Sequence, residues 1–237
     1  MPQEQQQLIR PEIRVDRSEI KYLISPQQAE LLSQMMRAIA KRDEHQGADA
    51  RYRVRSLYFD TLDAKSFREK EHGLMMRQKV RIRTYADDAA QMKLEIKCRK
   101  GDYSAKLSQW IDREVAADCC CGEYSSLQAV GGLAAETAMV LQRGLYLPTV
   151  LIDYDREAYR MDEFNIRITF DHNVRAAKTP TLFADPVPMI PIFTERRVVL
   201  EIKFDGVLPG HLRAALSLID APRTAISKYC LARERIG

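Results

Sequence analysis

Several signatures that define large protein classes are missing from this sequence. No apolar run approaches the roughly 18 residues that a membrane-spanning helix requires. Residues 1–16 are polar and charged, without the apolar stretch of a secretory signal. Three of the five cysteines are consecutive, from Cys119 to Cys121, so they form neither a CxxC pair nor a disulfide framework. We therefore expect a cytoplasmic protein that keeps its thiols reduced and does not itself span a membrane.

Glycine-rich phosphate loops and zinc-binding patterns are missing as well. The chain has no GxxxxGK[ST] loop and no GxGxxG loop, the motifs that hold phosphates with backbone amides. Its four histidines are scattered, and the consecutive cysteines lack the spacing of a tetrahedral zinc site. Any phosphate-binding site in this protein must therefore consist of side chains.

The composition is that of a globular protein with many charges of both signs. Of its 237 residues, 46% are hydrophobic and 30% are charged, and 37 basic against 33 acidic side chains leave a net charge of +4. We expect a polar N-terminal extension at residues 1–16 and a single domain over residues 17–237. Because the net charge is small, the distribution of charge along the chain is more informative than its sum.

Amphipathic segments alternate with strand-like segments. Apolar residues recur at intervals of three and four after Ser25 and Pro26, which indicates the start of a helix. The predicted helices cover residues 27–41, 61–71, 136–146, 210–218 and 225–235. The predicted strands, in which β-branched and aromatic residues alternate with polar ones, cover residues 18–24, 53–60, 78–85, 91–99, 103–113, 149–160, 165–172 and 197–204.

Short turns join several of these strands, which favours an antiparallel arrangement. The turns are Ala86-Asp87-Asp88, Lys100-Gly101-Asp102 and Met161-Asp162-Glu163. About eight antiparallel strands tend to close on themselves, because closure removes the edges of the sheet. The predicted fold class is α+β: a closed antiparallel β-barrel of roughly eight strands, with helices packed outside.

Charged residues share one face of five predicted strands. Residues two apart in a strand point the same way, so Lys93, Glu95 and Lys97 lie opposite Leu94 and Ile96. The same alternation occurs around Glu19 and Lys21, Arg81 and Arg83, Asn165 and Arg167, and Glu201 and Lys203. Such a face can contact water, as in an ordinary half-buried sheet. It can also line the inside of a barrel whose outer surface the helices cover.

A basic barrel interior would require an anionic ligand, because buried cations repel one another. Arginine offers forked contacts to phosphate oxygens and lysine offers a compact charge, while carboxylates can recruit Mg²⁺ or Mn²⁺ to bridge phosphates. We therefore expect a phosphate-rich polyanion together with a divalent cation. Nucleic acid is not expected, since the basic segments lack the interleaved aromatic residues of single-strand binding.

Short motifs occur in a characteristic order from about residue 17 to residue 235. They are Glu19-Ile20-Lys21-Tyr22, Ser56-Leu57-Tyr58-Phe59-Asp60-Thr61, Arg81-Ile82-Arg83, Leu94-Glu95-Ile96-Lys97, Ser104-Ala105-Lys106, Tyr154-Asp155-Arg156-Glu157-Ala158-Tyr159, Leu200-Glu201-Ile202-Lys203 and Ser227-Lys228-Tyr229. In this order they resemble the VTC domain, the polyphosphate polymerase module of the vacuolar transporter chaperone. That domain belongs to the triphosphate tunnel metalloenzyme (CYTH-like) superfamily.

The resemblance implies a tunnel in which cations clamp a triphosphate. The implied catalytic residues are Arg81, Arg83, Lys97, Arg167 and Lys228. The implied substrate-binding residues are Lys21, Lys106, Tyr154, Arg156, Ser227 and Lys203. Glu201 is the implied principal ligand of Mn²⁺ or Mg²⁺, and Glu19 and Glu95 are candidates either for the metal or as partners of nearby lysines.

One departure from the superfamily bears on the reaction. Its hydrolases resemble one another in an opening ExExK, whereas this chain reads Arg17-Ser18-Glu19-Ile20-Lys21. Arginine in place of a carboxylate favours phosphate binding over metal binding, and so favours a polymerase that transfers the γ-phosphate of ATP to inorganic polyphosphate. Two alternative functions stay open. One is a tripolyphosphatase or nucleoside triphosphatase of the same fold, and the other is a non-catalytic module that binds polyphosphate or inositol phosphates. The sequence leaves open whether the protein works together with a membrane protein, and it does not indicate an oligomeric state.

Overall fold

A computed structural model describes residues 17–43, 51–101, 103–183 and 186–237. Its centre is a 10-stranded sheet in which the long strands follow the order β1-β10-β8-β7-β3-β4-β5-β6. The polar extension expected at residues 1–16 lies outside the described residues, and the single domain expected over residues 17–237 stays a prediction. None of the helices in the described part of the chain is long and apolar enough to cross a membrane.

All neighbouring strands in the sheet run antiparallel, as the short turns predict. The strands are β1 (Arg17–Ile24), β2 (Lys41–Arg42), β3 (Tyr52–Asp60), β4 (Met76–Thr84), β5 (Gln91–Lys100), β6 (Tyr103–Asp112), β7 (Leu147–Met161), β8 (Ile166–Ala177), β9 (Ile190–Pro191) and β10 (Val198–Asp205). The eight long strands confirm the eight predicted ones. The two-residue strands β2 and β9 pair with β7 and β8, and their sequences are too short to show an alternation.

The helices are α1 (Pro26–Ile39), α2 (Lys65–Glu71), α3 (Arg113–Cys120), α4 (Ser125–Val130), α5 (Gly132–Arg143), α6 (Gly210–Ser217) and α7 (Lys228–Ile236). The predicted start of α1 is confirmed. Ser25 accepts a hydrogen bond from the backbone of Gln28, whose side chain accepts one from the backbone of Ser25, which forms a capping box. The short helices α3 and α4 were not predicted.

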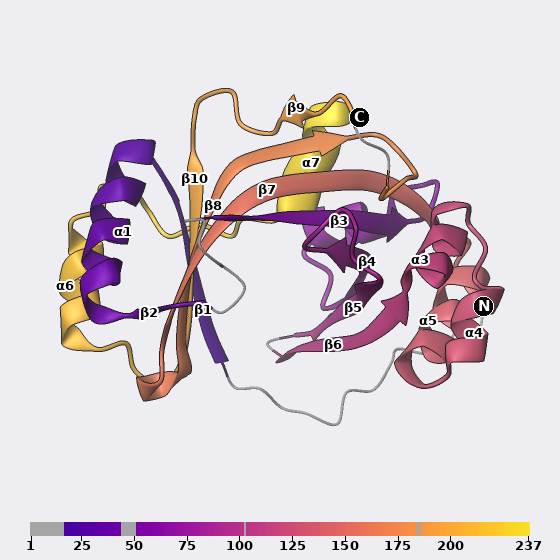
Figure 1. Ribbon diagram of the computed structural model, residues 1–237, viewed down its shortest axis with the longest axis horizontal. Coiled ribbons are helices and arrows are strands. Elements are labelled where there is room, and N and C mark those ends of the chain that lie inside the picture. Colours follow the sequence, from indigo (N-terminus) through magenta and orange to yellow (C-terminus); the bar gives the residue numbers. More distant parts are fainter. Residues whose placement is uncertain (1–16, 44–50, 102, 184–185) are drawn as a thin grey trace.

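The sheet is not closed into a barrel, so that part of the fold prediction is wrong. The long strands form an open path that ends at β1 and β6, and the sheet is curled between these edges (Figure 1). Strand number alone does not close a sheet, because tilt and register must also match around the ring. The free edge strand β6 instead carries exposed polar side chains such as Ser104, Lys106 and Ser108, as edge strands commonly do.

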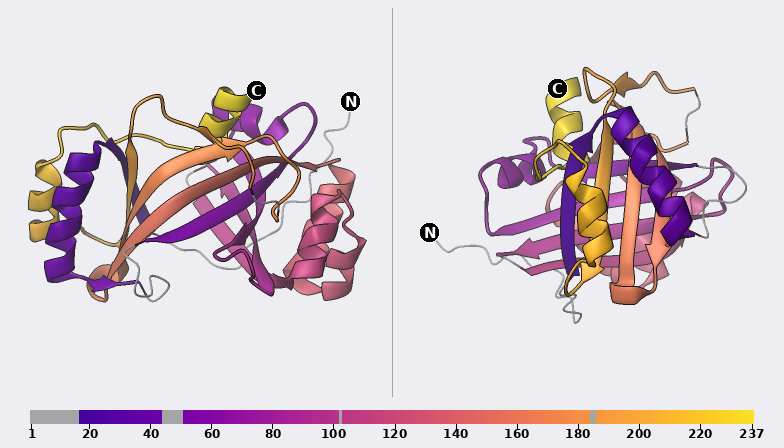
Figure 2. Two further views of the ribbon diagram at one scale, coloured as in Figure 1. Left: turned by 45° about the horizontal axis from the view of Figure 1, so that its top comes forward. Right: turned by 90° about the vertical axis from the view of Figure 1, so that its left-hand side faces the viewer.

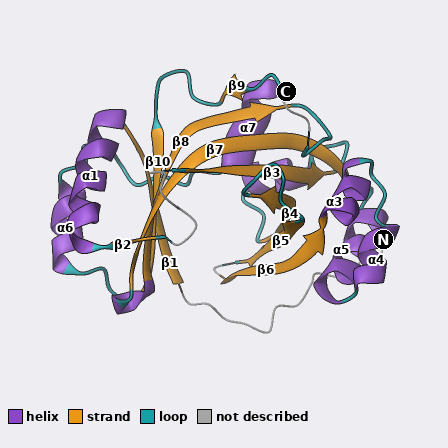
Figure 3. Ribbon diagram, viewed as in Figure 1, coloured by secondary structure: helices purple, strands orange, loops and turns teal. Residues whose placement is uncertain are grey.

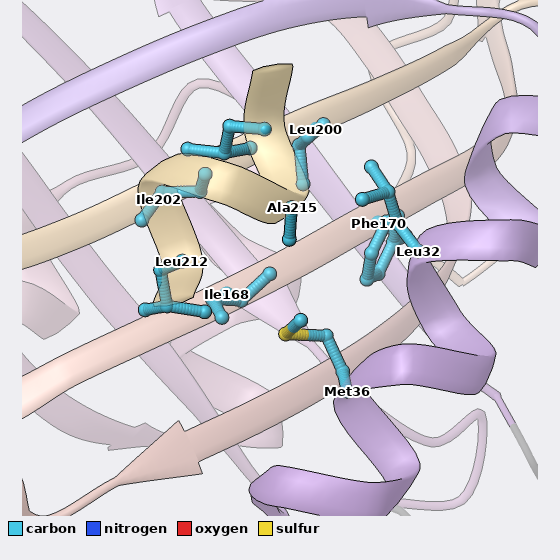
Figure 4. A pocket seen from close by; sticks show the side chains of 9 residues that line it. Leu32, Met36, Ile168, Phe170, Leu200, Ile202, Leu212 and Ala215 are labelled. Atoms are coloured by element: carbon cyan, nitrogen blue, oxygen red, sulfur yellow. The ribbon is translucent and has the colours of Figure 1, made fainter. Parts of the chain in front are cut away.

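Helices cover the apolar side of the sheet at both ends. At one end α1 and α6 pack side by side on β8 and β10 (Figures 2 and 3), burying Leu32, Met36, Phe170 and Leu200 among others. Figure 4 shows the apolar crevice between these two helices, which Leu212 and Ala215 also line. At the other end α3, α4 and α5 pack on the apolar side of β4, β5 and β6. These helices therefore lie outside the curl, as predicted.

Helix α7 differs, because it packs on the opposite side of the sheet. Its residues Tyr229 and Cys230 are buried in one cluster with Val54, Tyr58 and Val199. Val199 is two residues from Glu201 in β10 and therefore shares its face. The expectation that all helices pack outside is thus corrected: the residues of α7 have apolar partners on the inner side of the curled sheet.

Candidate functional site

The charged faces of the strands line the inner, concave side of the sheet. This inner face carries side chains from eight strands, with their backbone partners in register, such as Lys21 opposite Glu201 and Arg81 opposite Glu95. The alternate residues, such as Leu94 and Ile96, are fully buried under the outer helices. The sequence left two possibilities for the charged faces, contact with outside water or an inner lining. In the structure they form the inner lining.

Glu201 lies at the meeting point of β1 and β10. Its carboxylate is 3.3 Å from Lys21 Nζ and 2.6 Å from Lys203 Nζ. Glu19 is 3.0 Å from the same Lys21 and 3.8 Å from Lys203. Burial favours the neutral acid, but Lys203 and Lys21 outweigh it and hold the pKa of Glu201 well below its usual range. Two carboxylates and two lysines therefore lie within ion-pair distance of one another in a single cluster.

Asp171 in β8 forms a second cluster that sequence analysis missed. Its carboxylate accepts hydrogen bonds of 2.6 and 2.9 Å from Arg156 and lies 2.5 Å from Lys228 at the start of α7. The side chain is completely buried, which raises its pKa, but Arg156 and Lys228 lower the pKa of Asp171 to about 2. A signal was present, since Asp171 follows Arg167 and Thr169 at the spacing of one strand face.

Glu95 in β5 gathers three cations. Arg81 donates to it at 2.7 Å, Arg83 is 3.5 Å away, and Lys106 forms a further ion pair with it. Burial opposes ionisation of Glu95, but Arg81 and Arg83 together with Lys106 keep its pKa below the usual range. Glu95 therefore holds two arginines and a lysine at one place on the inner face.

Tyrosines connect these clusters. Arg83 donates to the hydroxyl of Tyr154 at 3.2 Å, and the Arg156 guanidinium and the Lys228 amine lie 5.1 and 4.9 Å from the centre of the Tyr154 ring. Tyr154 thus touches cations of both the Asp171 and the Glu95 clusters. Arg81 also donates to the hydroxyl of Tyr58 at 2.7 Å, a second tyrosine contact, and Tyr58 was not among the predicted site residues.

Three predicted residues stand further along the same face. Arg167 lies 2.7 Å from Asp43 and donates to Tyr52 at 3.4 Å, so its guanidinium is engaged away from the Glu201, Asp171 and Glu95 clusters. Lys97 lies 3.6 Å from Glu19. Ser227 caps α7 and accepts a hydrogen bond of 3.0 Å from Lys79, a lysine that sequence analysis did not select.

The donor set can be tested for a divalent cation. The described residues contain no group of three or more histidine, cysteine, aspartate or glutamate side chains placed to hold a metal. Mg²⁺ and similar ions, however, are often held by one or two carboxylates and take their other ligands from water and phosphate. Glu201 and Glu19, on neighbouring strands and sharing Lys21 and Lys203, fit that arrangement. Glu95, surrounded by three cations, fits the role of a counter-ion.

Two solved structures align with most of this chain. A crystal structure from Bacillus halodurans, provisionally described as that of an adenylate cyclase, aligns with a TM-score of 0.52 and 14% identity over 90% of this chain and 96% of that one. The PH1819 protein from Pyrococcus horikoshii aligns with a TM-score of 0.44 and 12% identity over 92% of this chain and 99% of that one. At such identity the first likeness shows the fold alone.

The family follows from the sequence match. Residues 16–236 match the model of the VTC domain, nearly the whole chain. The chain therefore belongs to the VTC domain family, as its motifs indicate. No curated protein matches the sequence.

Proposed function

We propose that this protein is a polyphosphate polymerase that transfers the γ-phosphate of ATP to a growing inorganic polyphosphate chain with the help of Mn²⁺ or Mg²⁺. The observation that carries this proposal is that single carboxylates of the inner face each pair with two or three cations. Glu95 is shared by three cations and Asp171 by two. The inner face therefore holds a surplus of positive charge, which a chain of phosphates would neutralise.

Phosphoryl transfer suits such a site because it needs positioning and charge neutralisation more than covalent help. Arg81, Arg83 and Arg156 supply forked donors to phosphate oxygens, while Lys21 and Lys228 supply compact charges. The acceptor end of a polyphosphate is already an anionic oxygen, so the reaction needs no general base. A divalent cation held by Glu201 and Glu19 would neutralise charge on the transferred group.

The membership of the VTC domain family supports the polymerase over its rivals, as does Arg17. This residue begins β1, in register with Asp205, where the hydrolases of the superfamily have a carboxylate. One carboxylate fewer and one cation more strengthen phosphate binding at the expense of metal binding.

Product analysis tests the proposal directly. Purified protein is incubated with ATP and either Mn²⁺ or Mg²⁺, and the products are separated by gel electrophoresis and chromatography. We expect ADP and long phosphate chains. ADP with orthophosphate and no chains would assign a hydrolase of the same fold, cyclic AMP with pyrophosphate would assign a cyclase, and phosphate-chain binding without turnover would assign a binding module.

A further inference from the structure

Trp110, the one tryptophan of the chain, stands out among the residues of the inner face. It lies in the edge strand β6, on the same face as Lys106 and Ser108, and 49% of its surface is exposed. Burying an aromatic side chain is strongly favourable, because it removes a large apolar area from water. Packing therefore does not account for an indole ring that is half exposed on an ionic surface.

The surroundings of Trp110 join it to the Glu95 cluster. In the sheet register Trp110 pairs with Lys93, which pairs in turn with Arg83. The Lys93 amine lies 5.3 Å from the centre of a Trp110 ring, a cation–π contact. Ser108, the backbone partner of Glu95, is two residues from Trp110, a separation of about 7 Å along a strand. The indole therefore borders the cations that Glu95 gathers.

We propose that Trp110 stacks on the nucleobase of a nucleoside triphosphate whose phosphates bind Arg81, Arg83 and Lys106. This inference rests on the proposed function, which requires a nucleotide donor and an inorganic acceptor in one site. Both substrates carry the same phosphates, so cations alone do not distinguish them. A flat aromatic ring at the border of the cations does, because every nucleobase has a face that stacks and an inorganic chain has none.

The geometry also gives an order of preference among nucleotides. Stacking is tolerant of base identity, but a purine covers more of the indole than a pyrimidine does. ATP and GTP should therefore bind more tightly than CTP and UTP. Inorganic tripolyphosphate should bind through the cations without touching the ring.

Tryptophan fluorescence tests the inference, since all tryptophan emission of this chain comes from Trp110. Titration with ATP is expected to change this emission, and titration to saturation with tripolyphosphate is expected to leave it nearly unchanged. Binding of both ligands is measured independently by calorimetry. Equal emission changes with the two ligands would contradict the inference.

A substitution gives the second measurement. Trp110→Ala should weaken ATP binding about 5- to 100-fold, the loss expected for one stacked base, and should leave tripolyphosphate affinity within about twofold. Phe164→Ala serves as the control, because Phe164 has a ring that is 51% exposed in the turn between β7 and β8. It should change neither affinity.

The outcomes separate this inference from the proposed function. If Trp110→Ala leaves ATP affinity unchanged, or weakens ATP and tripolyphosphate equally, the stacking role is wrong while the phosphate-binding face stands. If the unmodified protein binds neither ligand, the proposed function fails and the stacking role fails with it.

Discussion

Lys97 of β5 and Glu19 of β1 form an ion pair of 3.6 Å between strands that are not neighbours in the sheet. The two strands belong to opposite ends of the open strand path. Their side chains thus approach where no backbone hydrogen bonds join β1 to β6 among the described residues. Charged side chains of the inner face therefore contact one another across the gap between β1 and β5, although the sheet is open there.

We expect this ion pair to contribute little to stability. Replacing Lys97→Gln, which leaves the contacts of Glu19 with Lys21 in place, should change the free energy of unfolding by less than about 1 kcal/mol. Exposed ion pairs are weak, and the side chains of Lys97 and Glu19 are 52% and 27% exposed. Urea denaturation measures the change. A loss of several kcal/mol would mean that side-chain contacts between the edges hold the curl of the sheet.

Asp171 should behave in the opposite way. Asp171→Asn leaves Arg156 and Lys228 without their buried counter-ion, and removal of one partner from a buried ion pair costs about 3–5 kcal/mol. Because the folded-state pKa lies at about 2 against an ordinary 3.8, the wild type keeps this stabilisation above pH 3.8 and loses it as the pH falls through about 2.

Urea denaturation with and without tripolyphosphate measures the effect of Asp171→Asn. The ligand should restore part of the lost stability, because its phosphates can replace the missing negative charge. Asp162→Asn is the matched control, since Asp162 forms an exposed ion pair with Lys41 and its replacement should leave stability unchanged. Equal stability of the two variants would contradict the role of Asp171 as a buried counter-ion.

Glu201 should separate binding from turnover. Glu201→Gln removes the proposed metal ligand but keeps the shape of the side chain, so turnover of ATP should fall at least about 100-fold. Affinity for tripolyphosphate without metal should stay equal or rise, because Lys21 and Lys203 lose a competing carboxylate. Steady-state kinetics and calorimetry measure the two quantities.

Glu195→Gln is the control for this experiment, because Glu195 is exposed and pairs with Arg197 in the segment before β10. Unchanged turnover in Glu201→Gln would remove Glu201 from the metal site. If Glu201→Gln no longer binds tripolyphosphate in the absence of metal, Glu201 instead has a purely structural role, which is to position Lys21 and Lys203.

The sequence predicts the strands and their two faces well, because a period of two decides which residues lie together. Lys93, Glu95 and Lys97 alternate with residues that the structure buries, and the same alternation placed Glu201 and Lys203 together. Openness of the sheet could not be predicted in this way, since the pattern within a strand carries no information on how the edges meet. The inner position of α7 is likewise decided by partners such as Tyr58, which lie far away in the sequence.

The alternation within a strand does not determine which cation pairs with which carboxylate in the site. The sequence selects Glu95 and Arg81, but which of many cations converge on one carboxylate depends on the register between β4, β5 and β6. Asp171 was missed although its position in β8 places it on the charged face. Extending the alternation by one step beyond Thr169 would have found it.

Lys106 should make phosphate binding depend on pH. Burial and the neighbouring Arg81 outweigh the attraction of Glu95 and lower the pKa of Lys106 to about 8, although 47% of its side chain is exposed. The amine of the free protein is therefore charged below pH 8 and loses its proton as the pH rises. Bound phosphates favour the charged form, so affinity should fall as the pH rises above about 8.

Lys106→Arg isolates this titration, because a guanidinium stays charged throughout the range and the ligand's own titration is common to both proteins. Tripolyphosphate affinity, measured by calorimetry from pH 6.5 to 9.5, should fall about tenfold more in the wild type than in the variant over this range. Lys178→Arg, which changes an exposed lysine near the C-terminus of the chain, should follow the wild type. Parallel profiles for all three proteins would mean that Lys106 does not contact the phosphates, because a lysine that loses its charge near pH 8 within the site must weaken the binding of a polyanion.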